Sequence, residues 1–324
     1  MRSAFLASLA MLLLAADLPN DKDAKPVKIA EVPSYCEGIV FDHAGNAYIS
    51  HGESITKVTP DGKASVWTTT SVAASSAKRA IKGAPNGHKV LADGTHLVCD
   101  ASHHAVLRLD ANGKITGKAS AECDGKPLRG PNDLTLDTAN GGFYFTDPGG
   151  SDDKKLIGTV HYVDSKGKTH LCAEGLAFPN GIVLRPDGKT LLVAESKRNR
   201  ILVYPVEAPG KLGKMKVFAD LPAKEGEQID NQPDGICLDE AGNLYVAHYG
   251  MRQVQVLSPE GKLLRRYPGG NLTTSNVAFG GKDMDQLYVT GGLGKENEPG
   301  GGLFRLDLKG VRGLVILPKK QEKP

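Results

Sequence analysis

The sequence predicts an all-β protein that folds as a six-bladed β-propeller of four-stranded antiparallel blades. Three observations lead to this fold class. The 39 glycines and 19 prolines recur along the 324 residues instead of clustering, which indicates many short strands joined by tight turns. One pattern, a polar residue, a short apolar strand, a turn and a second apolar strand, recurs six times. Hydrophobic residues make up 40% of the chain, which is enough to fill a large core.

Each repeat opens on a side chain that carries oxygen. The openings lie 49, 46, 48, 54 and 41 residues apart, which leaves room for four short strands and their turns. A single four-stranded unit cannot cover both of its faces, whereas units packed radially bury their faces against each other. The six opening residues are Glu37, Asn86, Asn132, Asn180, Asp234 and Ser275.

Turn signals and second strands follow the openings. Asp187-Gly188 is one such turn, because glycine adopts the positive φ that a tight hairpin needs. Second strands such as residues 143–146 and 244–247 are rich in β-branched and aromatic residues. We expect the N-terminal run 27–32 and the C-terminal run 313–317 to pair in one blade and so close the circle.

The N-terminus resembles a secretory signal. Met1, Arg2 and Ser3 form a short cationic start, and the apolar run 4–16 is too short to span a bilayer. We therefore expect a signal peptide at 1–16, a linker at 17–28, the propeller at 29–318 and a polar tail at 319–324. The protein would be periplasmic or secreted, without membrane contact after cleavage. An uncleaved anchor or a buried strand is the alternative for residues 1–16.

Charge and cysteine content exclude some classes of function. The net charge is +3 and basic residues are scattered singly between acidic ones, unlike a nucleic-acid-binding surface. The five cysteines, at 36, 99, 123, 172 and 237, form neither a CxxC pair nor a zinc-ligand spacing. Four of them lie in or beside apolar runs, so we interpret them as core side chains rather than a disulfide framework.

The six opening residues predict a metal site. The innermost strand of each blade lines the channel of a propeller, so these residues should converge at one end of the axis. Two carboxylates among amides are costly to bury unless a cation or water satisfies them. This donor set suits one hard divalent ion, for which we expect calcium first, with zinc, magnesium and manganese as alternatives. The alternative interpretation is that each asparagine that follows a proline simply caps a turn.

The ends of the second strands should reach the same face. They carry His51, Asp100, Asp147, Glu195 and His248, which form either a pocket wall or solvated strand ends. The sequence has no Gly-x-Ser-x-Gly turn, phosphate-binding loop or dinucleotide glycine fingerprint, which argues against serine-hydrolase chemistry.

At these residues the chain resembles the gluconolactonase, senescence marker protein (regucalcin) and luciferin-regenerating-enzyme family. The resemblance rests on the segments 36–38, 130–133, 178–181, 233–235 and 274–280 and covers the chain from about residue 30 to its end. It implies that Glu37, Asn180 and Asp234 are metal ligands and that Asn132 binds metal or substrate. Gly130 stands where animal members can carry a substrate-binding arginine, and Arg129 is one residue out of register.

By this resemblance the chain would hydrolyse sugar lactones or related esters, with a small molecule as its partner. We expect the metal to polarise the carbonyl and a carboxylate to activate water, with Asp234, Asp133 and His248 as candidate catalytic residues. The candidate substrate-binding residues are Asn132, Asn86, Glu195, His51 and Ser275. Two alternatives stay open: a non-catalytic propeller that binds a protein or glycan, and a metal-dependent hydrolase of phosphotriesters or other esters.

Overall fold

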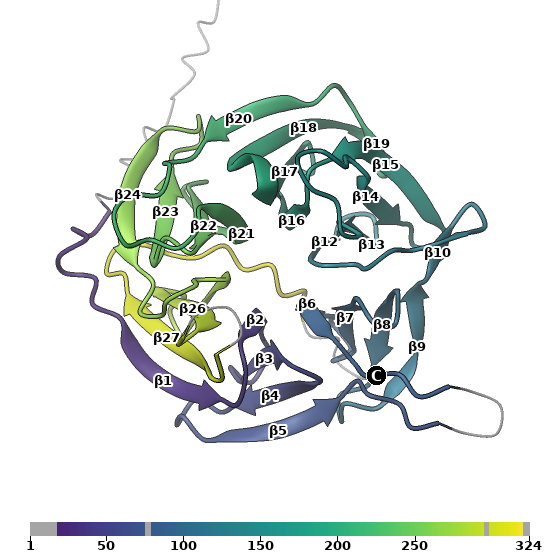
Figure 1. Ribbon diagram of the computed structural model, residues 1–324, viewed down its shortest axis with the longest axis horizontal. Coiled ribbons are helices and arrows are strands. Elements are labelled where there is room, and N and C mark those ends of the chain that lie inside the picture. Colours follow the sequence, from purple (N-terminus) through teal and green to yellow (C-terminus); the bar gives the residue numbers. More distant parts are fainter. Residues whose placement is uncertain (1–17, 75–78, 295–297, 320–324) are drawn as a thin grey trace, which may run out of the picture.

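The computed structural model describes residues 18–74, 79–294 and 298–319 and shows six antiparallel sheets arranged around a central axis (Figure 1). Each sheet is one blade, and in the first five blades the strands follow each other in sequence from the axis outward. The predicted fold class, an all-β six-bladed propeller, is confirmed.

The strands have the following bounds. Blade 1 contains β2 (Cys36–Phe41), β3 (Ala47–His51), β4 (Ser54–Val58) and β5 (Ala64–Thr69), and blade 2 contains β6 (Pro85–Val90), β7 (His96–Asp100), β8 (Ala105–Leu109) and β9 (Ile115–Ser120). A small hairpin of β10 (Glu122–Cys123) and β11 (Lys126–Pro127) precedes blade 3, which contains β12 (Leu134–Asp137), β13 (Gly142–Asp147), β14 (Gly158–Val163) and β15 (Thr169–Leu176).

Blade 4 is extended by one short strand. It contains β16 (Pro179–Leu184), β17 (Thr190–Glu195), β18 (Arg200–Ala208) and β20 (Lys216–Asp220), with β19 (Lys211–Leu212) also paired to β18. Blade 5 contains β21 (Gln232–Leu238), β22 (Leu244–Tyr249), β23 (Gln253–Leu257) and β24 (Leu263–Pro268), and blade 6 contains β25 (Asn276–Gly280), β26 (Gln286–Gly292) and β27 (Gly301–Asp307). Within the described ranges the one helical element is the single turn η1 (Ser196–Arg198).

The core is divided among the interfaces between blades. Tyr144 and Tyr162 of blade 3, for example, share a buried cluster with Leu191 and Tyr204 of blade 4. Turns between strands use the glycines that the sequence indicated, such as Gly188 with φ +66°. This explains why each repeat needs its neighbours: its apolar faces become buried only at the contact with the next blade.

Blade 6 is completed by the other end of the chain. The strand β1 (Val27–Val32) pairs antiparallel with β27, as the purple and yellow strands show in Figure 1. The expected role of the N-terminal run is confirmed, but its expected partner, residues 313–317, is wrong. The strand formed by residues 301–307 has an open edge in blade 6, and β1 pairs with that edge. Residues 313–317 do not take part in this pairing.

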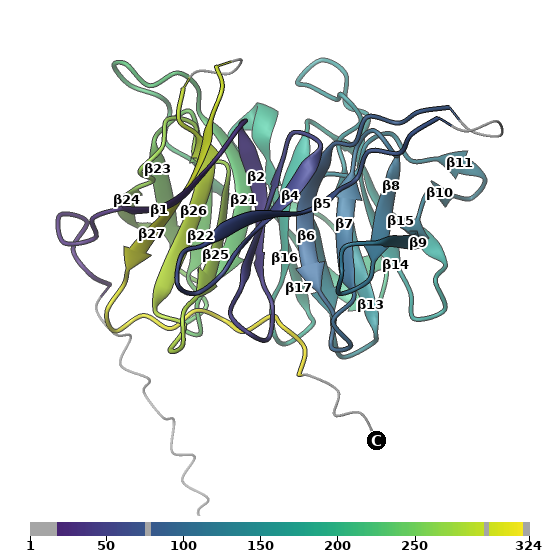
Figure 2. The same ribbon diagram turned by 90° about the horizontal axis from the view of Figure 1, so that it is seen from below.

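The C-terminal segment instead crosses one end of the propeller. Gly313 forms a bridge with Asp239, and Leu314 N–H donates to the carbonyl of Leu238 at the end of β21 (2.9 Å). In Figure 2 this segment runs along the end of the molecule opposite the starts of the inner strands. The segment therefore lies far from the ends of the strands where the opening residues are found.

Residues near the N-terminus are docked rather than extended away from the propeller. Ala24 is buried in a cluster shared by blades 5 and 6, with Leu18 packed against it, and the Tyr267 hydroxyl donates to the carbonyl of Pro19 (2.8 Å). Much of the expected linker 17–28 is thus attached to the surface, and β1 begins inside it. The expected signal peptide 1–16 and residues 320–324 of the expected tail lie outside the described residues.

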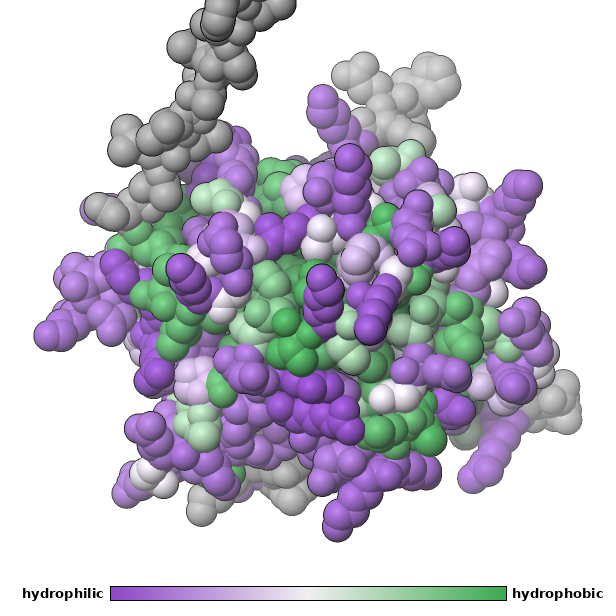
Figure 3. All heavy atoms as spheres, turned by 90° about the horizontal axis from the view of Figure 1, so that it is seen from above, coloured by the Kyte–Doolittle hydropathy of each residue, from purple (hydrophilic) through white to green (hydrophobic). Residues whose placement is uncertain are grey.

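All five cysteines are free. Of the four expected as core side chains, Cys36, Cys99 and Cys237 are buried and Cys172 is only partly buried, whereas Cys123, outside that set, is buried. Outer strands leave some large apolar side chains exposed, including Val66, Val217 and Leu263. Figure 3 shows one side of the molecule, where such hydrophobic patches alternate with abundant hydrophilic side chains. None of the helical structure in the described ranges has the length and apolarity needed to span a bilayer.

Candidate metal centre

The six opening residues lie on a closed circuit of contacts around the axis, which we call the ring: Glu37, Asn86, Asn132, Asn180, Asp234 and Ser275. Hydrogen bonds to the backbone carbonyls of the inner strands connect each blade to the next. They run from Ser50 to Asn86 (2.7 Å), Gly87 to Asn132 (2.8 Å), Thr146 to Asn180 (2.8 Å), Ser196 to Pro233 (2.6 Å), Gly235 to Ser275 (2.9 Å) and Ser275 to Cys36 (2.6 Å).

A bulge aims four of the ring side chains. In blade 4, Pro179 pairs with Glu195 and Ile182 with Val193, so that the inner strand has one residue more than its partner between these pairs. The same irregularity occurs at the start of the inner strands of blades 1, 2 and 5. A bulge of this kind redirects a side chain away from the pleat. It places Glu37, Asn86, Asn180 and Asp234 at equivalent positions of their strands.

The glycine that follows these residues allows the inner strands to approach each other. A Cβ atom on Gly38 would lie 2.1 Å from the carbonyl oxygen of Asn86, and one on Gly181 would lie 2.2 Å from that of Asp234. Such distances are far inside van der Waals contact. The Xaa-Gly pattern of the repeats is therefore a requirement of the narrow axis, and not only a turn signal.

Blades 3 and 6 carry a side chain where the other four blades have this glycine. Asp133 and Asn276 occupy these positions, and each accepts a bond from the next backbone N–H (2.8 Å). A Cβ atom on Gly87 would lie 2.4 Å from Asp133 Oδ1, and one on Gly235 would lie 2.2 Å from Asn276 Cγ. Glycine in the preceding blade thus makes room for Asp133 beside the ring.

Four oxygen atoms of the ring are buried and have no hydrogen-bond partner. They are Glu37 Oε2, Asn86 Oδ1, Asn132 Oδ1 and Asp234 Oδ1. Buried polar atoms are almost always satisfied in folded proteins, and each one that is not needs an explanation. The four unpartnered oxygens at one end of the axis can still accept hydrogen bonds or coordinate a cation.

The carboxylates of the ring repel each other. Burial raises the pKa of Asp234 well above its usual range, and the charges of Glu37 and Asp133 act in the same direction. Burial also raises the pKa of Glu37, opposed by hydrogen bonds from Tyr35 and Asn86. The pKa of Asp133 is raised by burial and lowered by Lys89, whose Nζ lies 4.0 Å from Asp133 Oδ1. A positive charge at the ring would relieve this repulsion.

These residues fit a hard cation and not a soft one. Within the described ranges, no three His, Cys, Asp or Glu side chains are grouped as a metal site. The ring instead combines two carboxylates with amide oxygens, the donors that calcium, magnesium and manganese accept. Asn180 lies against Asp234, to which its side chain is hydrogen-bonded. Glu37, Asn86, Asn132 and Asp234 are the residues whose free oxygens could hold the ion.

Three carboxylates at the second-strand ends are engaged elsewhere. Asp147 accepts bonds from the N–H groups of Arg129 (2.8 Å) and Gly130 (2.7 Å), and Asp100 accepts them from Ala84 and His103. Glu195 accepts from the N–H of Ala177 (2.9 Å) and from Arg200 Nε (2.6 Å). Each carboxylate braces the loop that leads into its own inner strand. The structure does not bring them to the ring.

The remaining predicted site residues are bonded within one blade or between neighbouring blades. His51 contacts Ser34 (3.5 Å) and Thr56 (2.8 Å) through its two ring nitrogens. The His248 Nε2 lies 2.8 Å from Asn199 Oδ1, and burial lowers the pKa of His248 to about 4. Ser275 donates its hydroxyl to the carbonyl of Cys36 and so joins blades 6 and 1.

Sequence reasoning missed two residues beside the ring, Tyr35 and Lys89. The Tyr35 hydroxyl donates to Glu37 Oε1 (3.0 Å). Tyr35 occurs in one blade only, so no repeat pattern could reveal it. Lys89 had a signal, because it is charged where the inner strands of blades 1, 4 and 5 carry the apolar residues Val40, Val183 and Cys237.

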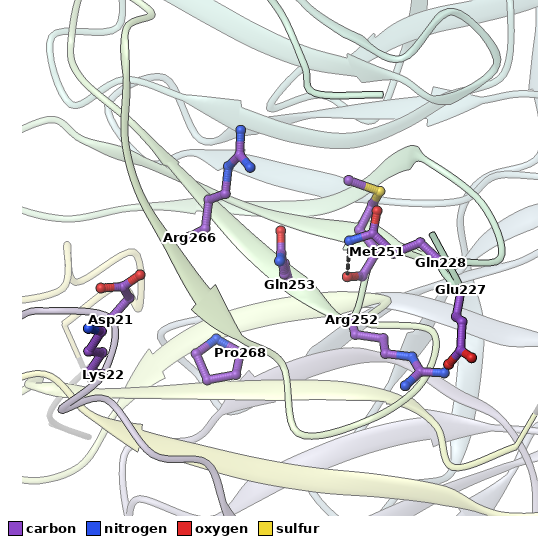
Figure 4. Close-up of a pocket in the computed structure, with 9 residues that line it drawn as sticks. All are labelled: Asp21, Lys22, Glu227, Gln228, Met251, Arg252, Gln253, Arg266 and Pro268. Atoms are coloured by element: carbon purple, nitrogen blue, oxygen red, sulfur yellow. Dashed lines mark hydrogen bonds between the residues drawn. The ribbon is translucent and has the colours of Figure 1, made fainter. Parts of the chain in front are cut away.

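Two further hollows lie in the described part of the chain. A cavity of about 820 Å³ toward the opposite end of the channel is lined by inner-strand residues such as Ile39, Ile236 and Val277, by Lys89 and by residues 314–319. A shallower pocket of about 360 Å³ lies between the N-terminal segment and blade 5 (Figure 4), where Gln228 donates to the carbonyl of Met251 (3.2 Å). No ring residue lines either hollow.

The fold and the ring together define a six-bladed propeller with buried oxygen-bearing side chains at one end of its axis. Residues 35–292 match the model of the family described as SMP-30/Gluconolactonase/LRE-like region, and the chain belongs to this family. The matched region contains the whole ring.

Curated relatives carry several enzyme names. A gluconolactonase from Zymomonas mobilis is 31% identical over 222 residues, which are 63% of this chain and 60% of that protein. The lactonase drp35 of Staphylococcus haemolyticus is 28% identical over 84% of this chain and 88% of its own. The diisopropyl-fluorophosphatase of Loligo vulgaris is 26% identical over 72% and 78% of the two chains.

Solved structures share the architecture. A gluconolactonase from Xanthomonas campestris superimposes with a TM-score of 0.73 at 25% identity, over 92% of this chain and 93% of the other. A calcium-binding regucalcin from Agrobacterium tumefaciens superimposes with a TM-score of 0.71 at 23% identity, over 93% and 98%. At 23% identity the second likeness concerns the fold alone.

Proposed function

We propose that this protein is a lactone hydrolase whose activity depends on one divalent cation, calcium first, held by the ring. The observation that carries the proposal is the set of four buried, unpartnered oxygens on Glu37, Asn86, Asn132 and Asp234. The names of its relatives, gluconolactonase and lactonase, support the substrate class.

The ring residues have separate tasks in this proposal. Glu37, Asn132, Asn180 and Asp234 hold the ion, and the free oxygen of Asn86 adds it to the expected set. A dication bound there would supply polarisation of the lactone carbonyl and stabilisation of the oxyanion. Neutral amides among the carboxylates limit the negative charge around an ester that itself gains negative charge during hydrolysis.

The proton of the attacking water goes to a carboxylate. Water oxygen adds to the carbonyl carbon, the ring C–O bond of the lactone breaks, and the departing oxygen takes a proton to leave a hydroxy acid. We assign the base to Asp133, because its side chain lies beside the ring without being one of the assigned ligands, with Lys89 Nζ 4.0 Å from its Oδ1. Asp234 is the second candidate, but a carboxylate that holds a cation is a weaker base.

A panel of sugar lactones and aliphatic lactones tests the proposal. Proton release is followed with the protein as purified, after chelation, and after the return of calcium, magnesium, manganese or zinc. We expect hydrolysis to disappear with chelator and return with a cation, and to be absent in Glu37→Gln under all conditions. Hydrolysis that persists at full rate in chelator contradicts the metal dependence. Cation binding without hydrolysis of any ester would favour the binding-module alternative.

A second candidate function is hydrolysis of phosphotriesters, since the squid diisopropyl-fluorophosphatase matches over most of both chains. An electrophilic phosphorus centre would gain from the same polarisation as a carbonyl carbon. Including an organophosphate in the panel separates the two, and the larger kcat/KM decides between them.

Export remains part of the proposal. It is supported by the cationic start and the short apolar run at 4–16. Fractionation of cells that express the full chain, with mass measurement of the exported protein, would show whether a segment ending near residue 16 is removed.

A further inference from the structure

Tyr35 contacts one of the two carboxylate oxygens of Glu37 and leaves the other without a partner. Its hydroxyl donates to Oε1 at 3.0 Å, whereas Oε2 of the same carboxylate is buried without a partner. Tyr35 lies in the turn before β2, two residues from Glu37, so a short stretch of backbone connects the two side chains. One oxygen is thus held by a phenol and the other is free for the ring.

We propose that Tyr35 is a positioning residue that fixes the Glu37 carboxylate so that Oε2 is presented to the cation. This inference rests on the proposed function, since it requires that a cation binds. A free glutamate side chain has many rotamers and loses their entropy when it becomes a ligand. A hydrogen bond that already selects one orientation removes part of this cost, and outer partners of metal ligands typically contribute 10–100-fold in affinity.

Tyr35 itself is held by a second aromatic residue. Its ring meets that of Tyr249 edge to face, with centroids 6.2 Å apart and an interplanar angle of 70°. Tyr249 ends β22 in blade 5, whereas Tyr35 precedes blade 1, so the pair spans the sector of blade 6.

The pair also makes the two sides of the ring chemically different. The charge of Asp234 acts on Tyr35 as well as that of Glu37, which places the phenol near both ring carboxylates. The pair lies on the side of the ring between blades 5 and 1, and blades 2 to 4 form the opposite side. This side carries the three asparagines of the ring, Asn86, Asn132 and Asn180, whose amides suit a polyhydroxylated ligand.

Calcium titration of the full chain tests the inference. Tyr35→Phe keeps the aromatic ring and its contact with Tyr249 and removes only the hydroxyl. We expect calorimetry on metal-free protein to show calcium affinity about 10–100-fold weaker than in the parent. The urea midpoint without calcium should fall modestly, because Glu37 Oε1 loses one hydrogen bond while the buried apolar contacts are retained.

Tyr162→Phe is the matched control. Its hydroxyl also donates to a carboxylate, Asp137 Oδ2 (3.0 Å). Asp137 is the last residue of β12 in blade 3 and is not part of the ring. We expect this variant to bind calcium as the parent does. Equal weakening in both variants would overturn the positioning role, because affinity would then follow the general loss of a hydrogen bond.

The remaining outcomes separate the two proposals. If the parent binds calcium and Tyr35→Phe binds it as tightly or more tightly, the positioning role is wrong and the cation-dependent function stands. If the parent binds none of calcium, magnesium, manganese and zinc, both proposals are wrong.

Discussion

The two ends of the central channel are built in opposite ways. At the ring end, inner strands begin with oxygen-bearing side chains, four of whose oxygens are buried without partners. At the other end the same strands carry Ile39, Ile236 and Val277, and the C-terminal segment covers them. The ring end therefore has polar oxygens without hydrogen-bond partners, whereas the other end buries apolar side chains.

This difference separates function from stability within each strand. Apolar burial stabilises a fold by about 25 cal/mol per Å², and the blades supply it along their whole interfaces. Unpaired buried oxygens cost free energy unless a ligand satisfies them. Unpaired buried oxygens are tolerated where a bound ligand satisfies them. We therefore expect substitutions at the ring to change ligand binding and substitutions at the other end to change the free energy of unfolding.

Removal of a ring carboxylate should have the largest effect. We expect Glu37→Gln and Asp234→Asn to weaken calcium binding by more than about 100-fold, above the effect of an outer partner. Each variant should be at least as stable as the metal-free parent. A carboxyl whose pKa is raised by folding destabilises the fold when it is ionised, and an amide lacks this penalty. Calorimetry and circular dichroism check the two expectations, and unchanged affinity in both variants would place the cation elsewhere.

The repeat made this end of the channel predictable. Six openings with a common polar position predicted both the propeller and the convergence of Glu37, Asn86, Asn132, Asn180, Asp234 and Ser275. Periodicity carries such information because equivalent positions of equivalent blades meet at the axis. The predicted ligand roles themselves stay predictions.

Features that occur once were not predictable. Tyr35 belongs to one turn only, and the second-strand carboxylates look alike in sequence whether they face a pocket or brace a backbone. Glu195 illustrates this, because only the structure shows Arg200 beside it. The C-terminal segment was misplaced for a similar reason, since its short apolar run at residues 314–317 suits a covering segment as well as an edge strand.

A single added methyl group should force two neighbouring inner strands apart. We expect Gly38→Ala to lower the free energy of unfolding by about 1–3 kcal/mol, because its Cβ would lie 2.1 Å from the backbone oxygen of Asn86 and the strands must separate. Calcium affinity should fall as well, since the ring widens. Gly117→Ala is the control, because no atom lies within 4 Å of its added Cβ. Equal stabilities in urea titrations of the two variants would refute the steric account.

Buried histidines away from the ring should make stability fall in acid. His88 Nε2 lies 2.7 Å from His96 Nδ1, and burial lowers the pKa of His96 to about 4. The unfolded state takes up a proton below about pH 6.5 while the folded state does not, so stability present at pH 7 is lost as the pH falls toward 4. For His96 alone the loss between pH 7 and pH 5 is on the order of 2 kcal/mol.

Trp67 offers a local probe for this effect, because its ring lies 4.5 Å from that of His96. Urea unfolding at pH 7 and pH 5, followed by Trp67 fluorescence, measures the loss, and His96→Gln should reduce it. A pH dependence as large in His96→Gln as in the parent would contradict the neutral state of the buried His96.

The smallest effect should come from the covered end of the channel. Ile316 packs partly buried against the cluster of blades 4 and 5, whereas its neighbour Val315 is 51% exposed. Ile316→Ala removes apolar atoms from a site that is only half buried, so we expect a loss of about 1 kcal/mol in unfolding free energy. Val315→Ala should cost less, because its side chain faces solvent. Calcium affinity should be the same in both variants and the parent, since the backbone bond from Leu314 to Leu238 stays in place. A shift in calcium affinity with Ile316→Ala would mean that the covered end communicates with the ring, and the separation of stability from function along the inner strands would no longer hold.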